Sequence, residues 1–139
     1  MIFLCFHYEQ DAYSYDIEQS RNDEVHNMLT SIMRAEDNLS LQDAMSLIHA
    51  HISALKERFL AIHEEVWSQQ QQSSEPGDTL LTLLAYIEGI GNWVRANDAW
   101  SFESQRYFGP KGLEIQAARV VQLQPKRVKS TVPPHSAEI

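Results

Sequence analysis

The 139-residue sequence contains a single cysteine, Cys5, and no long apolar run. One cysteine cannot form an internal disulfide bond, so we expect no disulfide framework and a reducing compartment, the cytoplasm. The apolar residues 1–6 are too few for the core of a signal peptide, and no basic segment precedes them. No stretch approaches the roughly 18 apolar residues that a transmembrane helix requires. The sequence therefore predicts a cytoplasmic chain that does not enter a membrane.

Basic side chains are scarce, and they are unevenly placed. The chain has 11 basic and 19 acidic residues, a formal net charge of −8. Residues 1–104 carry 5 basic and 17 acidic side chains, whereas residues 105–139 carry 6 and 2. An acidic body repels phosphates, so we do not expect a nucleic acid as partner, although carboxylates can hold divalent cations. The basic, proline-containing residues 110–139 predict a disordered tail.

Strand-like alternation is almost absent, whereas helical spacing recurs along the chain. Apolar residues at alternating intervals of four and three predict one long amphipathic helix: Leu41, Met45, Ile48, Ile52, Leu55, Phe59, Ile62 and Val66. Ser40 and Asp43 predict a capping box at its start. Further helices are predicted at about residues 2–19 and at 25–33. Another is predicted to begin after Asp78, which can serve as its N-cap. The last of these has so many apolar residues that we expect it to be buried nearly all round. The predicted fold is all-α, with antiparallel helices.

Gln10, Ser14 and Glu18 follow one another at intervals of four in the first predicted helix. At about 100° per residue, they lie within about 80° of one another on one face. An amide, a hydroxyl and a carboxylate offer the hard oxygen ligands that Mg²⁺ prefers. The same spacing is common on ordinary solvated helix faces, so spacing alone leaves both interpretations open.

Aromatic and arginine side chains are concentrated in residues 93–109. This segment holds two tryptophans, two phenylalanines, one tyrosine and two arginines, in a chain that is 9% aromatic. Aromatic faces can stabilise a cation, and the Arg106–Tyr107 pair can hydrogen-bond a phosphate from two directions. A helix end with aromatic core packing and a capping ion pair is the alternative interpretation.

Taken together, the two segments resemble the C-terminal half of fungal-type class I sesquiterpene (terpene) synthases. The likeness covers about residues 11–109. Residues 10–18 resemble the family's second metal motif, N-D-x-x-S-x-x-x-E, and Arg106 and Tyr107 resemble its C-terminal arginine–tyrosine pair. The resemblance implies the C-terminal part of an all-α helical bundle. It also implies Mg²⁺-dependent ionisation of farnesyl diphosphate, an isoprenyl diphosphate, followed by release of diphosphate and cyclisation of the carbocation.

The resemblance assigns roles residue by residue. Ser14 and Glu18 correspond to ligands of one Mg²⁺, of which the complete family enzyme holds three, and Arg106 and Tyr107 correspond to the diphosphate-binding pair. Gln10 stands where the family has Asn, and its extra methylene displaces the amide by about 1.5 Å. Gln10 is therefore the least certain of the metal ligands.

The sequence also departs from the family by what it does not contain. The aspartate-rich motif that the family carries upstream is missing, and residues 23–27 imitate it only on the wrong side of the metal motif. Residues 1–10 look unlike the family. One hypothesis is that the start of the gene is incorrectly assigned and that these residues are translated from an intron. We expect such a truncated chain to be inactive alone and to self-associate through exposed apolar faces. The alternative is a small interaction module that binds a partner helix through the 41–66 stripe.

Overall fold

The computed structural model describes residues 2–35, 39–73 and 77–128, and within these ranges all regular secondary structure is helical. Five α-helices follow one another: α1 (Ile2–Arg21), α2 (Met28–Ala35), α3 (Leu41–Gln72), α4 (Asp78–Glu103) and α5 (Gly112–Ala118). Two short 3-10 helices, η1 (Glu24–His26) and η2 (Gly109–Lys111), precede α2 and α5. The prediction of an all-α fold is confirmed.

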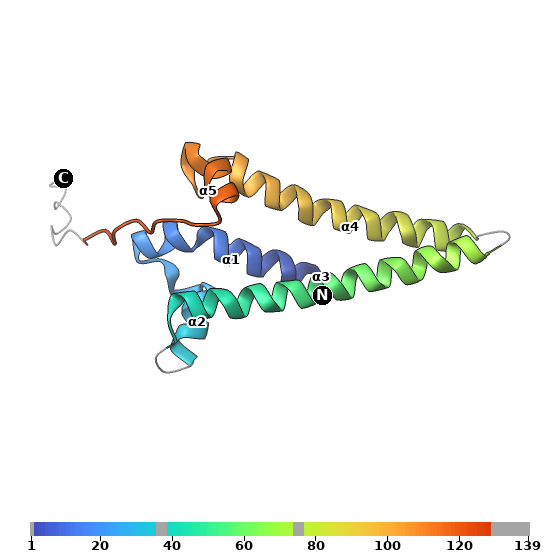
Figure 1. Ribbon diagram of the computed structural model, residues 1–139, viewed down its shortest axis with the longest axis horizontal. Coiled ribbons are helices and arrows are strands. Elements are labelled where there is room, and N and C mark those ends of the chain that lie inside the picture. The colour runs from blue at the N-terminus through green and yellow to red at the C-terminus, as the bar shows by residue number, and fades with distance from the viewer. Residues whose placement is uncertain (1, 36–38, 74–76, 129–139) are drawn as a thin grey trace, which may run out of the picture.

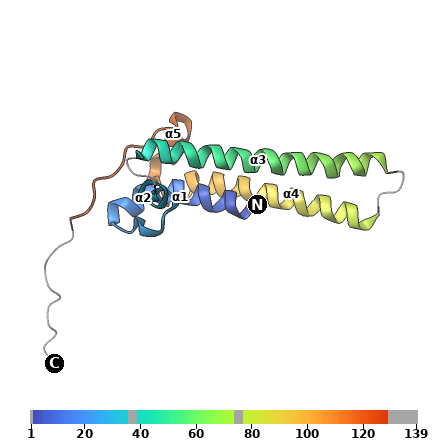
Figure 2. The same ribbon diagram turned by 90° about the horizontal axis from the view of Figure 1, so that it is seen from below.

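Helices α3 and α4 form a long antiparallel hairpin, and α1 packs against both at one end of it (Figure 1). Helix α2 lies against the beginning of α3, and α5 folds back on the end of α4. Seen after a quarter turn, α1 and α2 still lie at this end of the hairpin, away from the α3–α4 turn (Figure 2). The chain is therefore thick at one end and two helices wide at the other.

Helix α3 begins as its sequence predicts. The Ser40 hydroxyl accepts a hydrogen bond from Asp43 N at 3.1 Å, and the Asp43 carboxylate accepts one from Ser40 N at 3.3 Å. This capping box satisfies main-chain groups that a helix start leaves unpaired.

The apolar stripe of α3 faces the other helices of the chain. Ile48, Ile52 and Val66 are buried, and most of the remaining stripe residues are partly buried against these clusters. Because the 41–66 stripe is already packed in the core, it is not available to bind a partner helix. This disfavours the alternative of a small interaction module.

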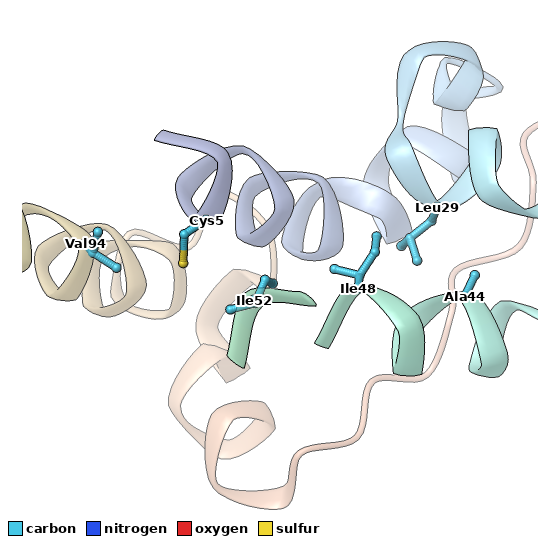
Figure 3. Packing of buried hydrophobic residues seen from close by; sticks show 6 residues of the cluster. All are labelled: Cys5, Leu29, Ala44, Ile48, Ile52 and Val94. Atoms are coloured by element: carbon cyan, nitrogen blue, oxygen red, sulfur yellow. The ribbon is translucent and has the colours of Figure 1, made fainter. Parts of the chain in front are cut away.

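The main core joins α1, α2, α3 and α4 at the thick end of the hairpin. Its buried side chains are shown in Figure 3: Cys5, Leu29, Ala44, Ile48, Ile52 and Val94. Burying a Leu or Ile side chain stabilises a fold by about 1.5–3 kcal/mol. A second, smaller cluster of Val66, Leu84 and Ile87 joins α3 to α4 towards the turn.

Three local predictions were wrong. The helix expected at 25–33 is interrupted, because Asn27 is extended (φ −70°, ψ 136°) and α2 begins only at Met28. The residue before α4 is Gly77, and Asp78 is already inside the helix. Helix α4 is not buried nearly all round: Leu83 and Tyr86 are 43% and 64% exposed, because α1 and α3 cover only one side of it.

The prediction of a disordered tail is wrong for residues 112–128. Helix α5 lies within it, and the segment after α5 hydrogen-bonds to α1, from Gln124 N to Asp16 Oδ1 (2.7 Å) and from Arg127 N to Ser20 O (2.7 Å). Residues 129–139 lie outside the described part of the chain. Among the helices that are described, none has both the length and the apolar character needed to cross a membrane.

Candidate metal and diphosphate site

The five residues singled out from the sequence line one cavity of about 440 Å³. Gln10, Ser14 and Glu18 come from one face of α1, as their spacing predicts. Arg106 and Tyr107 come from the loop after α4, almost ninety residues further along the chain. The structure therefore brings the oxygen-bearing face and the arginine–tyrosine pair together across a shared space.

A hydrogen bond connects the two halves of this site directly. The Gln10 side-chain amide donates through Nε2 to the hydroxyl of Tyr107, which is only 5% exposed. Because the nitrogen of the amide is engaged in this way, the oxygen Oε1 is the atom of Gln10 that can still ligate a cation. Ser14, one turn further along α1, is 7% exposed and lines the same cavity.

Glu18 is held by a residue that the sequence alone does not single out. Asn27 donates through Nδ2 to Glu18 Oε2 at 3.0 Å and to the main-chain oxygen of Asp11 at 2.8 Å. Asn27 directly precedes the apolar residues of α2, so its capping position was readable from the sequence. Its contact with Glu18 was not, because this contact depends on how α2 turns back onto α1.

Asp11 also lines the cavity, but its carboxylate has a structural partner. Asp11 Oδ2 accepts a hydrogen bond from Met28 N, the first residue of α2, at 2.8 Å. Burial raises the pKa of Asp11, and this hydrogen bond opposes the rise. A carboxylate at the first N–H groups of a helix is favourably placed, so Asp11 fixes α2 onto α1.

The Arg106–Tyr107 loop depends on two residues with left-handed backbone conformation. Gln105 (φ 62°) follows the end of α4, and Gly109 (φ 57°) opens η2. The chain then returns onto α4 at Gly112, where an added Cβ would lie 1.8 Å from the carbonyl oxygen of Phe102. Only glycine permits this close approach.

Aromatic side chains anchor this loop to α1. Phe102 and Phe108 stack with ring centroids 4.8 Å apart, and the Tyr13 ring meets Phe102 edge-on at 5.0 Å. The Tyr13 hydroxyl donates to Asp98 Oδ1 at 2.5 Å. Burial, followed by this hydrogen bond, raises the pKa of Tyr13. Phe102 and Phe108 are therefore half-buried and pack against each other and against Tyr13 of α1.

The Arg106 side chain is exposed, with its guanidinium carbon 5.9 Å from the ring centroid of Trp100 and 5.6 Å from that of Tyr107. Throughout the described ranges, Arg106 forms no ion pair with a carboxylate. Its N–H groups can therefore receive an anion, and the two nearby aromatic rings can interact with its positive charge.

The donor set of the cavity suits a hard cation that keeps part of its water shell. Within residues 2–35, 39–73 and 77–128, no three His, Cys, Asp or Glu side chains gather as a metal cluster. The candidate set instead has one carboxylate, one hydroxyl and one amide oxygen. Mg²⁺ is commonly bound in this way, through one or two carboxylates, water and the phosphates of a substrate. These residues fit a divalent cation that binds together with an anionic ligand.

Comparisons with known proteins point to one family. The sequence model described as "Terpene synthase family 2, C-terminal metal binding" matches residues 3–58, which include most of the segment interpreted as an atypical leader. The Delta(6)-protoilludene synthase of Armillaria ostoyae is 40% identical over 126 residues, which are 89% of this chain and 34% of the relative. A Delta(6)-protoilludene synthase of Stereum hirsutum is 42% identical over 118 residues, 84% of this chain and 31% of the relative.

The Delta(6)-protoilludene synthase of Cyclocybe aegerita is 40% identical over 130 residues, 91% of this chain and 19% of that longer relative. The chain thus spans about a third or less of the length of these relatives. The matches confirm the resemblance carried by the motifs: the chain is similar to the C-terminal metal-binding part of terpene synthases.

Proposed function

We propose that this chain supplies half of the metal and diphosphate site of a sesquiterpene synthase that acts on farnesyl diphosphate. One observation carries the proposal: Gln10, Ser14, Glu18, Arg106 and Tyr107 line a single cavity although they come from distant parts of the chain. In the proposed role, the three α1 side chains hold Mg²⁺, one of three ions in the complete enzyme, and Arg106 and Tyr107 hold the diphosphate.

The chemistry expected of the site is loss of diphosphate from an allylic carbon. When bound, Mg²⁺ supplies Lewis-acid stabilisation of the negative charge that develops on the leaving diphosphate. Arg106 offers a planar fork of N–H donors to the same oxygens, and Tyr107 lines the same cavity. Donors that are fixed in advance stabilise developing charge most effectively, because they need not reorganise during the reaction. The place of Arg106 in the cavity lining, near the Trp100 and Tyr107 rings, supports this role.

The chain alone is proposed to be inactive in catalysis. A single Mg²⁺ stabilises the charge that develops on a leaving diphosphate less than the three ions of the complete enzyme would, and the Armillaria ostoyae relative is about three times as long as the matched segment. The exposed side of α4, which carries Leu83, Tyr86 and Trp100, offers an apolar surface in this chain. We expect the isolated chain, which we place in the cytoplasm, to self-associate through it.

Catalysis is tested in a chain extended at its N-terminus by the upstream half of a relative. Incubated with farnesyl diphosphate and Mg²⁺, the extended protein should yield terpene hydrocarbons or alcohols, detected by gas chromatography–mass spectrometry. Glu18→Ala should abolish turnover, because it removes the one carboxylate among the three proposed α1 ligands. Glu103→Ala, which removes an exposed carboxylate outside the cavity, is the matched control. Unchanged turnover in Glu18→Ala would refute the assignment of Glu18 as a ligand.

A further inference from the structure

Asn27 occupies an unusual position between η1 and α2. It is 2% exposed, and both ends of its side-chain amide are engaged. The oxygen Oδ1 accepts a hydrogen bond from Leu29 N at 3.0 Å, which caps the start of α2. The nitrogen Nδ2 donates to the main-chain oxygen of Asp11 at 2.8 Å and to Glu18 Oε2 at 3.0 Å. A single buried side chain thus connects the start of α2 with two turns of α1.

The contact with Glu18 has a consequence for the free carboxylate oxygen. A glutamate side chain is flexible, and immobilising one costs up to about 2 kcal/mol of rotamer freedom. With Oε2 held by Asn27, the Glu18 carboxylate is already restrained before any cation binds. Among the described residues, the Glu18 carboxylate has no further hydrogen bond or ion pair, so Oε1 is the oxygen left for a ligand.

We propose that Asn27 is a positioning residue for the metal site: it orients the Glu18 carboxylate in the cavity and ties that orientation to the start of α2. The inference rests on the proposed role of Glu18 as a metal ligand. Hydrogen-bonded partners behind a ligand fix its orientation, and removing one typically weakens metal binding by about 10- to 100-fold. A donor that is neutral also satisfies Glu18 Oε2 without cancelling the negative charge that attracts the cation.

The capping role and the positioning role of Asn27 can be separated by substitution. Asn27→Asp keeps the shape and the oxygen that caps Leu29 N, but it replaces the donor with a second carboxylate oxygen next to Glu18. Asn27→Ser also keeps a good N-cap acceptor, because Ser and Asn cap helices about equally well, yet its side chain is too short for the Glu18 contact. The serine variant is therefore expected to remain folded, which circular dichroism checks.

Metal binding is measured on the complete 139-residue chain with Mn²⁺ as the probe. Mn²⁺ is titrated in the presence of inorganic diphosphate and followed by electron paramagnetic resonance. We expect both variants to bind Mn²⁺ about 10- to 100-fold more weakly than the original chain. Asn97→Ser is the control, because Asn97 is also a buried asparagine (8% exposed) but lies on α4 and outside the cavity. Its Mn²⁺ affinity should not change.

A double-mutant cycle tests whether Asn27 acts through Glu18. In a Glu18→Ala background, adding Asn27→Ser should weaken Mn²⁺ binding no further. A purely structural role for Asn27 would instead give an additional loss. If the original chain binds no Mn²⁺, the proposed metal site itself is wrong and the inference falls with it. If the original chain binds Mn²⁺ and both Asn27 variants bind it equally well, only the positioning role is overturned.

Discussion

The two ends of the α3–α4 hairpin are stabilised by different kinds of contact. At the site end, the main apolar core is joined by hydrogen bonds between distant parts of the chain, such as Tyr13 to Asp98 and Gln124 to Asp16. At the turn end, the small cluster of Val66, Leu84 and Ile87 holds two helices together. Across that end, His63 Nε2 lies 4.0 Å from Glu88 Oε1.

This difference indicates where cooperative stability resides. Regions with many buried contacts unfold only with the whole protein, whereas regions with few open locally at lower free energy. The candidate ligands lie in the cross-connected end, where orientation matters most for a metal site. We therefore expect the turn end to open without disturbing them.

Leu29→Ala should have the largest effect on stability. Leu29 is fully buried at the junction of α1, α2 and α3 (Figure 3). Removing such a side chain costs about 2–5 kcal/mol of unfolding free energy, since it leaves a cavity. Urea unfolding monitored by circular dichroism should show a lower midpoint for the whole chain, and amide exchange should rise in all the helices of the core.

Leu84→Ala is the matched substitution at the turn end. Leu84 is 7% exposed and lies in the smaller cluster, so its loss should increase amide exchange mainly near the turn. If amide exchange increased uniformly across α1 and α2 as well, the two ends of the hairpin would form one cooperative unit. The proposed difference in stability between the two ends would then be wrong.

The same comparison explains which parts of the molecule the sequence predicts. The α3 stripe and the Ser40–Asp43 capping box follow local rules of spacing and hydrogen bonding, and both are present. The shared face of Gln10, Ser14 and Glu18 follows from helix geometry. The pairing of this face with Arg106 came from a resemblance to a family and not from spacing, because no local rule relates residues so far apart.

What the sequence does not predict depends on contacts between distant residues. The segment 119–128 has no apolar periodicity, and it is fixed on α1 by amide and main-chain hydrogen bonds more than a hundred residues away in sequence. Composition alone made it look like a disordered tail. The apolar residues on the exposed side of α4 predict a buried face. An apolar stripe alone does not show whether another helix covers it.

Asp16→Ala should have the next largest effect, confined to segment 119–128. Asp16 is 6% exposed and accepts two hydrogen bonds from Gln124, from its main-chain N at 2.7 Å and from its Nε2 at 2.9 Å. Hydrogen bonds to charged groups contribute about 1.5–3 kcal/mol each. Lys126 and Arg127 are already exposed, but releasing the segment should free its main chain to enter the active site of trypsin, and cleavage there should become much faster.

The control for this substitution is Asp23→Ala, which removes an exposed carboxylate from the neighbouring turn that forms no side-chain cap. Tryptic cleavage after Lys126 should proceed at the original rate in this variant. Equal rates in the Asp16→Ala variant and the original chain would show that the segment is not held by Asp16.

Cys5 offers a chemical probe of the site end, with a smaller effect on stability. Burial, followed by the nearby Glu9 carboxylate, raises the pKa of the Cys5 thiol to about 11. The thiolate is the reactive form, so iodoacetamide at pH 8 should modify Cys5 slowly in the folded chain and rapidly in urea. Rapid modification of the folded chain would show that the first turns of α1 open easily.

The raised pKa of Cys5 also sets the direction of a pH dependence. An unfolded cysteine loses its proton near pH 8.5, whereas the folded one keeps it to about pH 11. Between these values the unfolded state binds fewer protons, so the free energy of unfolding falls as pH rises. In Cys5→Ala, urea unfolding should therefore depend less steeply on pH between 8.5 and 11.

Lys126→Ala should have the smallest effect, although it removes a contact of the same segment. Lys126 Nζ lies 2.7 Å from Glu24 Oε1, and this hydrogen bond lowers the pKa of the Glu24 carboxyl. A group with a lowered pKa contributes stability above its unfolded pKa and loses it as pH falls. The ion pair is exposed at the lysine and is screened by salt, so we expect the urea midpoint at neutral pH and 0.15 M salt, about physiological strength, to stay unchanged. A shift as large as that of Asp16→Ala would show that surface charge, rather than the buried Asp16 carboxylate, holds segment 119–128 on α1.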